Sequence, residues 1–149
     1  MPYTNEQKQA LRTMIAFRRA ERSISRDENR VCREYGVTPV QFGVLETLYS
    51  GGDLHVGELM ERILATPGNM TVVLRNMERD GFILRRQDET DRRSYLLSLT
   101  DKGRGLIGEM LPKHAALAEE IWSVLSVQEQ NEIAALLTKF YHEKEKHNG

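Results

Sequence analysis

Apolar residues recur every three or four positions along most of this chain, the spacing that gathers side chains on one face of a helix. Thr4 with Gln7, and Ser126 with Glu129, form capping-box patterns, which mark the start of a helix. In one region apolar and polar residues instead alternate with a period of two, the pattern of β-strands. We therefore predict helices over residues 4–35, 38–50, 55–64, 66–80, 100–125 and 126–142, and strands over 82–87 and 94–99.

The two terminal helices of this prediction have apolar positions that point to a partner. The last helix has a clear amphipathic stripe, made of Ile133, Leu136, Leu137, Phe140 and Tyr141. The first helix is longer, and arginines crowd most of its faces around a loose stripe at Met14, Ile15 and Phe17. A helix this long and this polar is rarely stable alone. We expect it to pack against another chain.

The helices predicted over 55–64 and 66–80 are joined by only one or two residues, so they must cross at a steep angle. This is the helix-turn-helix arrangement, whose second helix can enter the major groove of DNA. Its apolar residues turn toward the core: Met70, Val73, Leu74 and Met77. Its first amides, near Thr66, form a phosphate-binding end. The residues predicted to face outward are Pro67, Gly68, Asn69, Thr71, Val72 and Arg75.

The outward side chains suit the groups that DNA presents in its major groove. Asn69 is suited to pair with adenine, Arg75 with guanine or a phosphate, and Thr71 with either. Val72 has no other explanation on a solvated face, and it suits a thymine methyl group. The alternative interpretation of the same pattern is an ordinary helical hairpin with a solvated polar face.

The strands predicted after these helices favour DNA binding over that alternative. The connector at residues 88–93 is charged and lacks glycine, which predicts an open hairpin tip rather than a tight turn. Such a hairpin is a wing, and it places cations where a neighbouring minor groove or backbone would lie. Those cations are Arg85, Arg86, Arg92 and Arg93. Asp91 is placed to orient Arg93.

The overall charge does not indicate nucleic-acid binding, since the net charge of the 149 residues is -1. Lys and Arg number 8 against 7 Asp and Glu in residues 1–54, 9 against 8 in 55–104, and 4 against 7 in 105–149. DNA binding therefore requires a locally arranged surface. The low basicity motivates an alternative function, a winged fold that binds another protein without DNA. No apolar run approaches the roughly 20 residues of a membrane span, so we expect a cytoplasmic protein.

Three short motifs carry a resemblance to the MarR family of bacterial regulators. They are D-x-R at Asp91 and Arg93, L-T-x-x-G at Leu99, Thr100 and Gly103, and the step from Gly81 to Arg85. The resemblance covers essentially the whole chain, including the order and length of the helices. Two positions depart from the family's pattern. His55 stands where Ser or Thr usually caps the first helix of the motif, and Pro67-Gly68 is unusual at the start of the second.

The resemblance implies a mainly α, winged-helix (α+β) fold with about six helices and a two-stranded wing. It implies a homodimer built through residues 1–36 and 105–149, with 37–104 as the DNA-binding lobe. It further implies a repressor of nearby genes that binds a pseudo-palindromic operator in double-stranded DNA and is released by a small amphipathic or phenolic ligand. The resemblance implies that the positions that read bases in the family are Asn69, Thr71, Val72 and Arg75 of this chain, and that its wing-tip positions are Asp91 and Arg93.

Other reactive residues indicate little chemistry. Cys32 offers a redox-sensing alternative, because neighbouring Arg30 and Arg33 would lower its pKa, although packing is the favoured interpretation. The four histidines form no i, i+4 pair, which argues against a zinc site. The sequence also lacks a glycine-rich phosphate loop and a recognisable nucleophile set. We therefore predict no enzyme, no metal and no cofactor, with the effector and its pocket unidentified.

Overall fold

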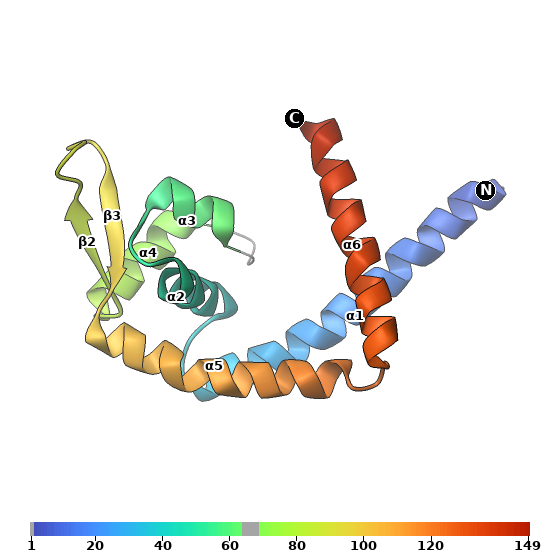
Figure 1. Ribbon diagram of the computed structural model, residues 1–149, viewed down its shortest axis with the longest axis horizontal. Coiled ribbons are helices and arrows are strands. Elements are labelled where there is room, and N and C mark those ends of the chain that lie inside the picture. Colours follow the sequence, from blue (N-terminus) through green and yellow to red (C-terminus); the bar gives the residue numbers. More distant parts are fainter. Residues whose placement is uncertain (1, 64–68) are drawn as a thin grey trace. The chain divides into compact units, whose positions relative to one another are not determined.

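The computed structural model describes residues 2–63 and 69–149, and most of them are helical (Figure 1). The helices are α1 (Asn5–Glu34), α2 (Pro39–Gly51), α3 (Val56–Arg62), α4 (Met70–Arg79), α5 (Asp101–Trp122) and α6 (Val127–Asn148). The strands are β1 (Leu54–His55), β2 (Ile83–Gln87) and β3 (Tyr95–Leu99). The predicted mainly α winged helix is confirmed. Within the described ranges, no helix is both long and apolar enough to span a bilayer.

Helix starts follow the capping signals in the sequence. The backbone N–H of Gln7 donates to Thr4 Oγ1 at 3.1 Å, and the backbone N–H of Thr4 donates to Gln7 Oε1 at 2.9 Å. The same reciprocal pair forms at Thr38 and at Ser126. Each pair satisfies two amides that the first turn of a helix leaves without partners. The starts of α1, α2 and α6 are therefore determined locally.

The wing is a three-stranded antiparallel sheet rather than the predicted two-stranded hairpin, with the order β1-β3-β2. In the hairpin, Ile83 lies opposite Leu99 and Gln87 lies opposite Tyr95. The added strand pairs Leu54 with Leu97. A strand of two residues is too short to show a period of two, and its second residue, His55, falls within the predicted helix over 55–64.

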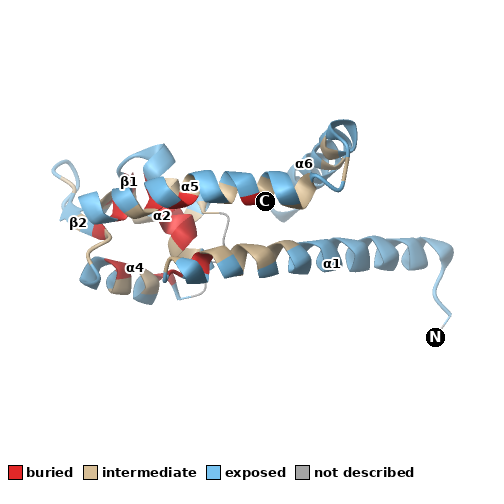
Figure 2. Ribbon diagram, turned by 90° about the horizontal axis from the view of Figure 1, so that it is seen from below, coloured by how far each residue is buried: buried red, intermediate tan, exposed pale blue. Residues whose placement is uncertain are grey.

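The chain forms two compact units, Met1–His114 and Ala115–Gly149. In the first unit, α4 contributes Met70, Leu74 and Met77 to the core as predicted, while Val73 is only half-buried. Figure 2 shows buried residues concentrated on α2, α4 and the neighbouring strands. The most deeply buried side chains are Val44, Leu45, Leu59, Met77, Ile83, Leu97, Ile107 and Met110.

The L-T-x-x-G motif is a joint between three elements of the first unit. The hydroxyl of Thr100 donates to the carbonyl of Gly81 at 2.5 Å and accepts from the amide of Gly103 at 3.0 Å. The amide of Thr100 also donates to the carbonyl of Phe82 at 3.1 Å. A Cβ atom added to Gly103 would lie 2.1 Å from that same carbonyl oxygen. The motif therefore fixes the start of α5 against the segment that follows α4.

Replacing Gly103 with alanine is expected to destabilise the fold, because the new methyl group collides with backbone rather than with a flexible side chain. We expect Gly103→Ala to lower the free energy of unfolding by about 2 kcal/mol. Chemical denaturation followed by circular dichroism measures the difference. Gly105→Ala in the same helix is the control, since a Cβ there meets nothing within 4 Å. Equal stability of the two variants would contradict the close packing of Gly103 against the carbonyl of Phe82.

The terminal helices expose the apolar residues that the sequence analysis selected. Phe17 on α1 is 53% exposed and Phe140 on α6 is 66% exposed. In Figure 2 the half of α1 nearest the N-terminus is coloured as exposed along its length. Other exposed residues of these stripes are Met14, Ile15, Leu136, Leu137 and Tyr141. Apolar faces of this kind are typical of surfaces that a partner covers.

Candidate nucleic-acid interface

Helix α4 presents one face to solvent and one to the core. Thr71, Val72 and Arg75 lie on the exposed face, and the Val72 residue is 38% exposed. Their helical neighbours Met70 and Leu74 are buried. An exposed valine between a threonine and an arginine gives this face apolar contact area as well as hydrogen-bond donors. The combination matches the methyl groups and acceptor atoms in the major groove of DNA.

The start of α4 differs from the prediction. The helix begins at Met70, and Asn69 precedes it in the left-handed conformation, with φ 42° and ψ 45°. Asn is one of the few non-glycine residues that adopt this conformation readily. The carbonyl of Asn69 accepts from the amides of Val72 and Val73 at 3.1 and 3.2 Å, and its side chain does not cap the helix. The predicted contacts at Thr66 and Gly68 lie outside the described residues.

The helix before it also ends earlier than predicted. Helix α3 ends at Arg62, and Ile63 is extended. Most of the connection between the two helices of the motif lies outside the described residues.

Two aspartates organise the tip of the wing. Asp88 accepts from both the amide and the hydroxyl of Thr90, at 2.9 and 2.8 Å. Asp91 accepts from the amide of Arg93 at 3.1 Å and from the hydroxyl of Ser94 at 3.2 Å. Short side-chain-to-backbone bonds of this kind replace the glycine that a tight turn would need. The open tip predicted from the sequence is therefore built by its acidic residues.

The arginines of the wing fall into two pairs. Arg85 lies 3.6 Å from Glu78 of α4 and has a side chain only 30% exposed. Arg86 donates to Asp53 at 2.7 Å. Arg92 and Arg93 lie at the tip, where the side chain of Arg93 is 95% exposed and 3.5 Å from Asp91.

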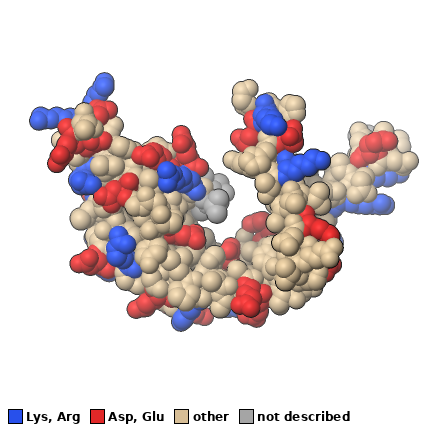
Figure 3. All heavy atoms as spheres, in the orientation of Figure 1, with Lys and Arg blue, Asp and Glu red and all other residues tan. Residues whose placement is uncertain are grey.

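Charged atoms of both signs cluster at the hairpin tip in Figure 3, with Lys and Arg atoms projecting beyond them. Arg92 and Arg93 are therefore available to a ligand, while Arg85 and Arg86 are paired with acidic residues of the protein.

His55 occupies a site that the sequence did not indicate. Its Nδ1 lies 2.7 Å from Glu58 in the first turn of α3, and its Nε2 lies 2.5 Å from Asp88 at the end of β2. Hydrogen bonds from these two carboxylates, that of Asp88 first, raise the pKa of His55. Hydrogen bonds with Thr90 and then His55 lower the pKa of Asp88 to about 2. A histidine at the start of a helix does not by itself indicate such a pair of contacts. Its second partner, Asp88, is 33 residues away in the sequence.

A cavity of about 490 Å³ lies between α1, α2 and α5 in the first unit. Phe42 and Met110 give it an apolar wall, and the ring of His114 lies beside that of Phe42, tilted by 46° with the centroids 4.9 Å apart. His114 Nε2 is 3.1 Å from a carboxylate oxygen of Glu28, so a polar pair lies beside the apolar wall. Small-ligand sites typically combine an apolar lining with a few polar groups in a volume of this order.

Cys32 lines the same cavity and is buried. Burial, and then the nearby Glu28 carboxylate, raise the pKa of its thiol. The thiolate is the form that oxidants attack, and a raised pKa disfavours it. The geometry therefore favours packing over redox sensing for Cys32.

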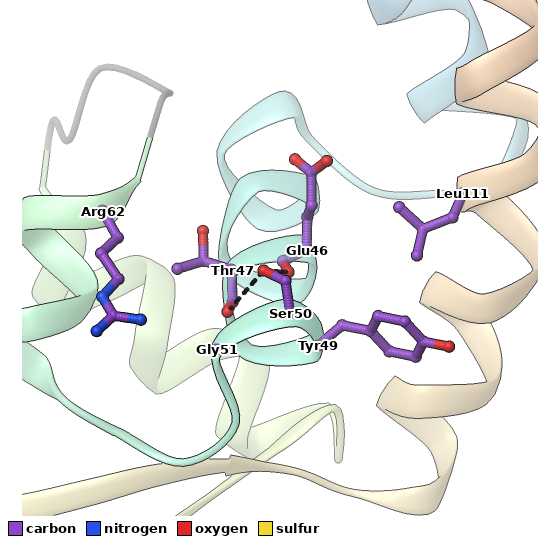
Figure 4. Close-up of a pocket in the computed structure, with 7 residues that line it drawn as sticks. All are labelled: Glu46, Thr47, Tyr49, Ser50, Gly51, Arg62 and Leu111. Carbon is purple, nitrogen blue, oxygen red and sulfur yellow. Dashed lines mark hydrogen bonds between the residues drawn. The ribbon is translucent and has the colours of Figure 1, made fainter.

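A second hollow, about 380 Å³, lies where α2 meets Arg62 of α3 and Leu111 of α5 (Figure 4). The hydroxyls of Thr47 and Ser50 donate to backbone carbonyls of their own helix, at 2.7 and 2.9 Å. Glu46, Tyr49 and Arg62 also line the hollow and contribute charged and hydroxyl groups to it. Within residues 2–63 and 69–149, no group of three or more His, Cys, Asp or Glu residues is arranged to hold a metal ion.

Comparison with known proteins identifies the family. The profile of the MarR family matches residues 37–95. The HTH-type transcriptional regulator YkoM of Bacillus subtilis is 37% identical over 134 residues, which cover 90% of this chain and 87% of that protein. Among solved structures, an Escherichia coli MarR mutant complexed with operator DNA has a TM-score of 0.81 at 20% identity, over 92% of this chain and 99% of that one.

A second solved structure concerns the regulation of DNA binding of Bordetella bronchiseptica BpsR by 6-hydroxynicotinic acid. It has a TM-score of 0.79 at 25% identity and covers 95% of this chain and 98% of that one. The family profile spans the helix-turn-helix and the start of the wing, and the identity to YkoM extends across nearly the whole chain. This chain belongs to the MarR family.

Proposed function

We propose that this chain is a transcriptional repressor that binds operator DNA as a homodimer and releases it when a small amphipathic or phenolic ligand binds. The observation that carries the proposal is one surface: the exposed face of α4 with Val72 and Arg75, together with Arg93 at the tip of the wing. An apolar and hydrogen-bonding helix face beside an exposed arginine suits a major groove and the adjacent backbone. The DNA complex of the Escherichia coli relative supports this use of the fold.

The proposed contacts divide into those that read bases and those that hold the backbone. Asn69, Thr71, Val72 and Arg75 are assigned to base edges, with Gly68 as the small residue that allows their close approach and the amides near Thr66 at a phosphate. Arg92 and Arg93 are assigned to the minor groove or its phosphates, and Asp91 orients Arg93. Arg85 and Arg86, which the sequence also predicts as DNA contacts, are better suited to holding the wing against Glu78 and Asp53.

The homodimer is proposed from the apolar stripes of the terminal helices. Residues 1–36 and 105–149 would form its interface, and the winged lobe at 37–104 would be carried once by each subunit. Two-fold symmetry then presents two α4 helices to two half-sites about 34–36 Å apart, one turn of DNA. An operator with pseudo-palindromic half-sites fits this symmetry.

The effector site is proposed at the cavity between α1, α2 and α5. A phenol or similar group would stack on Phe42 and donate to Glu28 or contact His114. The ligand weakens DNA binding only by the difference between its affinities for the DNA-bound and the released conformations. The action of 6-hydroxynicotinic acid on BpsR supports a small hydroxylated aromatic compound as effector.

Binding of a labelled fragment from the chain's own promoter region, measured by fluorescence anisotropy, tests both halves of the proposal. We expect tight binding that 4-ethylphenol weakens about tenfold, within the usual range of allosteric coupling. Glu28→Gln in the cavity should reduce the effect of the phenol, because the acceptor charge is lost. Glu34→Gln on the same helix is the control.

Two results would count against the proposal in different ways. Failure to bind any promoter fragment at low salt would favour the protein-interaction alternative. An equal response of both Glu→Gln variants to the phenol would remove the cavity as the effector site.

A further inference from the structure

His55 connects three parts of the winged lobe. It ends β1, it precedes the first residue of α3, and its ring reaches Asp88 just beyond β2. The central strand β3 separates β1 from β2 in the sheet, so this contact spans the strand between them. Arg86 and Asp53 make a second contact of the same kind, at 2.7 Å. The hairpin is thereby tied to the start of the helix-turn-helix by side chains as well as by the sheet.

We propose that His55 is a positioning residue for the wing: in its doubly protonated form it fastens the hairpin to the helix-turn-helix, so that operator binding weakens when His55 loses its proton. The inference rests on the proposed DNA-binding function.

The reason lies in the hydrogen bonds that the ring must make. A carboxylate only accepts hydrogen bonds, and carboxylates face both nitrogens of the ring. A neutral imidazole has one N–H and can donate to one of them. Both contacts are satisfied only when both nitrogens carry a proton. The two short distances therefore describe an imidazolium held between two acids.

The charged groups around His55 agree with this assignment. From α3 the facing group is Glu58, and the charge of Arg62 lowers the pKa of that carboxyl only as a minor contribution. From beyond β2 the facing group is Asp88, while Arg86 is bound to Asp53. From β3 the paired residue is Leu96, which is uncharged.

The pH range of the contact follows from the direction of each shift. The pKa of His55 is raised, so its contribution is present at low pH and is lost as the pH rises through the raised value. The pKa of Asp88 is lowered to about 2, so its contribution is lost only as the pH falls toward that value. The contact is therefore intact between the lowered pKa of Asp88 and the raised pKa of His55, and it is released as the pH rises through the latter.

Asp88 carries the effect to DNA. The same carboxylate that accepts from His55 accepts from Thr90 and starts the turn that presents Arg92 and Arg93. When His55 is neutral, the hairpin has one fewer attachment and its tip must be ordered at the moment of binding. Ordering a segment on binding reduces affinity.

The test is operator affinity as a function of pH, from pH 6 to pH 9.5, for the wild-type chain and for His55→Gln and Asp88→Asn. We expect wild-type affinity to fall about fivefold as the pH rises, the range of one partly exposed ion pair. Both variants should bind at the weaker level at all pH values. His147→Gln, on the exposed end of α6, should keep the wild-type profile.

Asp88→Asn distinguishes a positioning role of the His55–Asp88 contact from an effect of net charge on DNA binding. Removing a negative charge near DNA should tighten binding if only net charge matters, and it should weaken binding if Asp88 holds His55. Tighter binding by Asp88→Asn, or a wild-type pH profile in His55→Gln, would overturn the proposal.

An NMR titration of the His55 Cε1–H resonance without DNA provides a second readout, independent of operator binding. Asp88→Asn should lower the pKa of His55, and an unchanged titration would also overturn the proposal. A chain that binds no promoter DNA at any pH would contradict the proposed function. The titration would still show whether His55 and Asp88 are in contact.

Discussion

Phe140→Glu is expected to convert the proposed dimer to a monomer and to reduce operator affinity at least about 100-fold. Phe140 lies in the apolar stripe of α6 and is 66% exposed on the single chain. A carboxylate at the centre of an apolar interface loses its hydration without gaining a partner. A monomer binds one half-site only, and losing the second site typically reduces affinity by factors of 10² to 10⁴.

Light scattering after size exclusion gives the oligomeric state, and anisotropy gives the affinity. Thr138→Glu adds the same charge on the other side of α6 and should leave both measurements unchanged. A Phe140→Glu chain that remains dimeric would show that α6 does not form the interface.

Arg75→Ala is expected to reduce operator affinity by about 5- to 150-fold, with little loss on DNA of random sequence. The estimate corresponds to the 1–3 kcal/mol that one good base contact contributes to discrimination. Arg75 lies on the exposed face of α4, one turn after Thr71. Titrations against operator and scrambled duplexes give the ratio of the two affinities. Arg79→Ala is the control on the same helix, because Arg79 is bound to Asp80 at 3.1 Å.

Substitutions at the wing tip should behave differently from those on α4. Arg93→Ala removes a cation that is proposed to touch the DNA backbone or the minor groove, so affinity should fall on operator and random DNA alike. The slope of log affinity against log salt should flatten by about one unit. An Arg75→Ala variant that lost affinity equally for both duplexes would assign Arg75 to the backbone instead.

The elements that the sequence predicted correctly are those determined by near neighbours. The capping boxes at Thr4, Thr38 and Ser126 join residues three positions apart, and each starts a helix as predicted. The inward positions of α4 follow from helical spacing alone. The strand β1 escaped prediction because its pairing with β3 depends on a segment more than 40 residues later.

The candidate site was predictable in outline but not in its internal connections. Sequence spacing identified the outward face of α4 and the charged tip of the wing. It treated the four arginines of the wing alike, since the partners of Arg85 and Arg86 are distant residues brought close by the sheet. His55 was noted only as a departure from the family's pattern, because Asp88 lies 33 residues away. The Thr66-Pro67 start signal likewise did not indicate that Asn69 adopts a left-handed conformation before Met70.

The Thr100 joint has a consequence for how an effector can act. Because it bonds the end of α4, the base of the hairpin and the start of α5 together, each lobe of the proposed dimer would approach its half-site as a rigid body. The proposed effector would then leave the preferred bases of a half-site unchanged and alter only the distance between the two lobes. Operators with base pairs added or removed at their centre would in that case recover affinity in the presence of the effector.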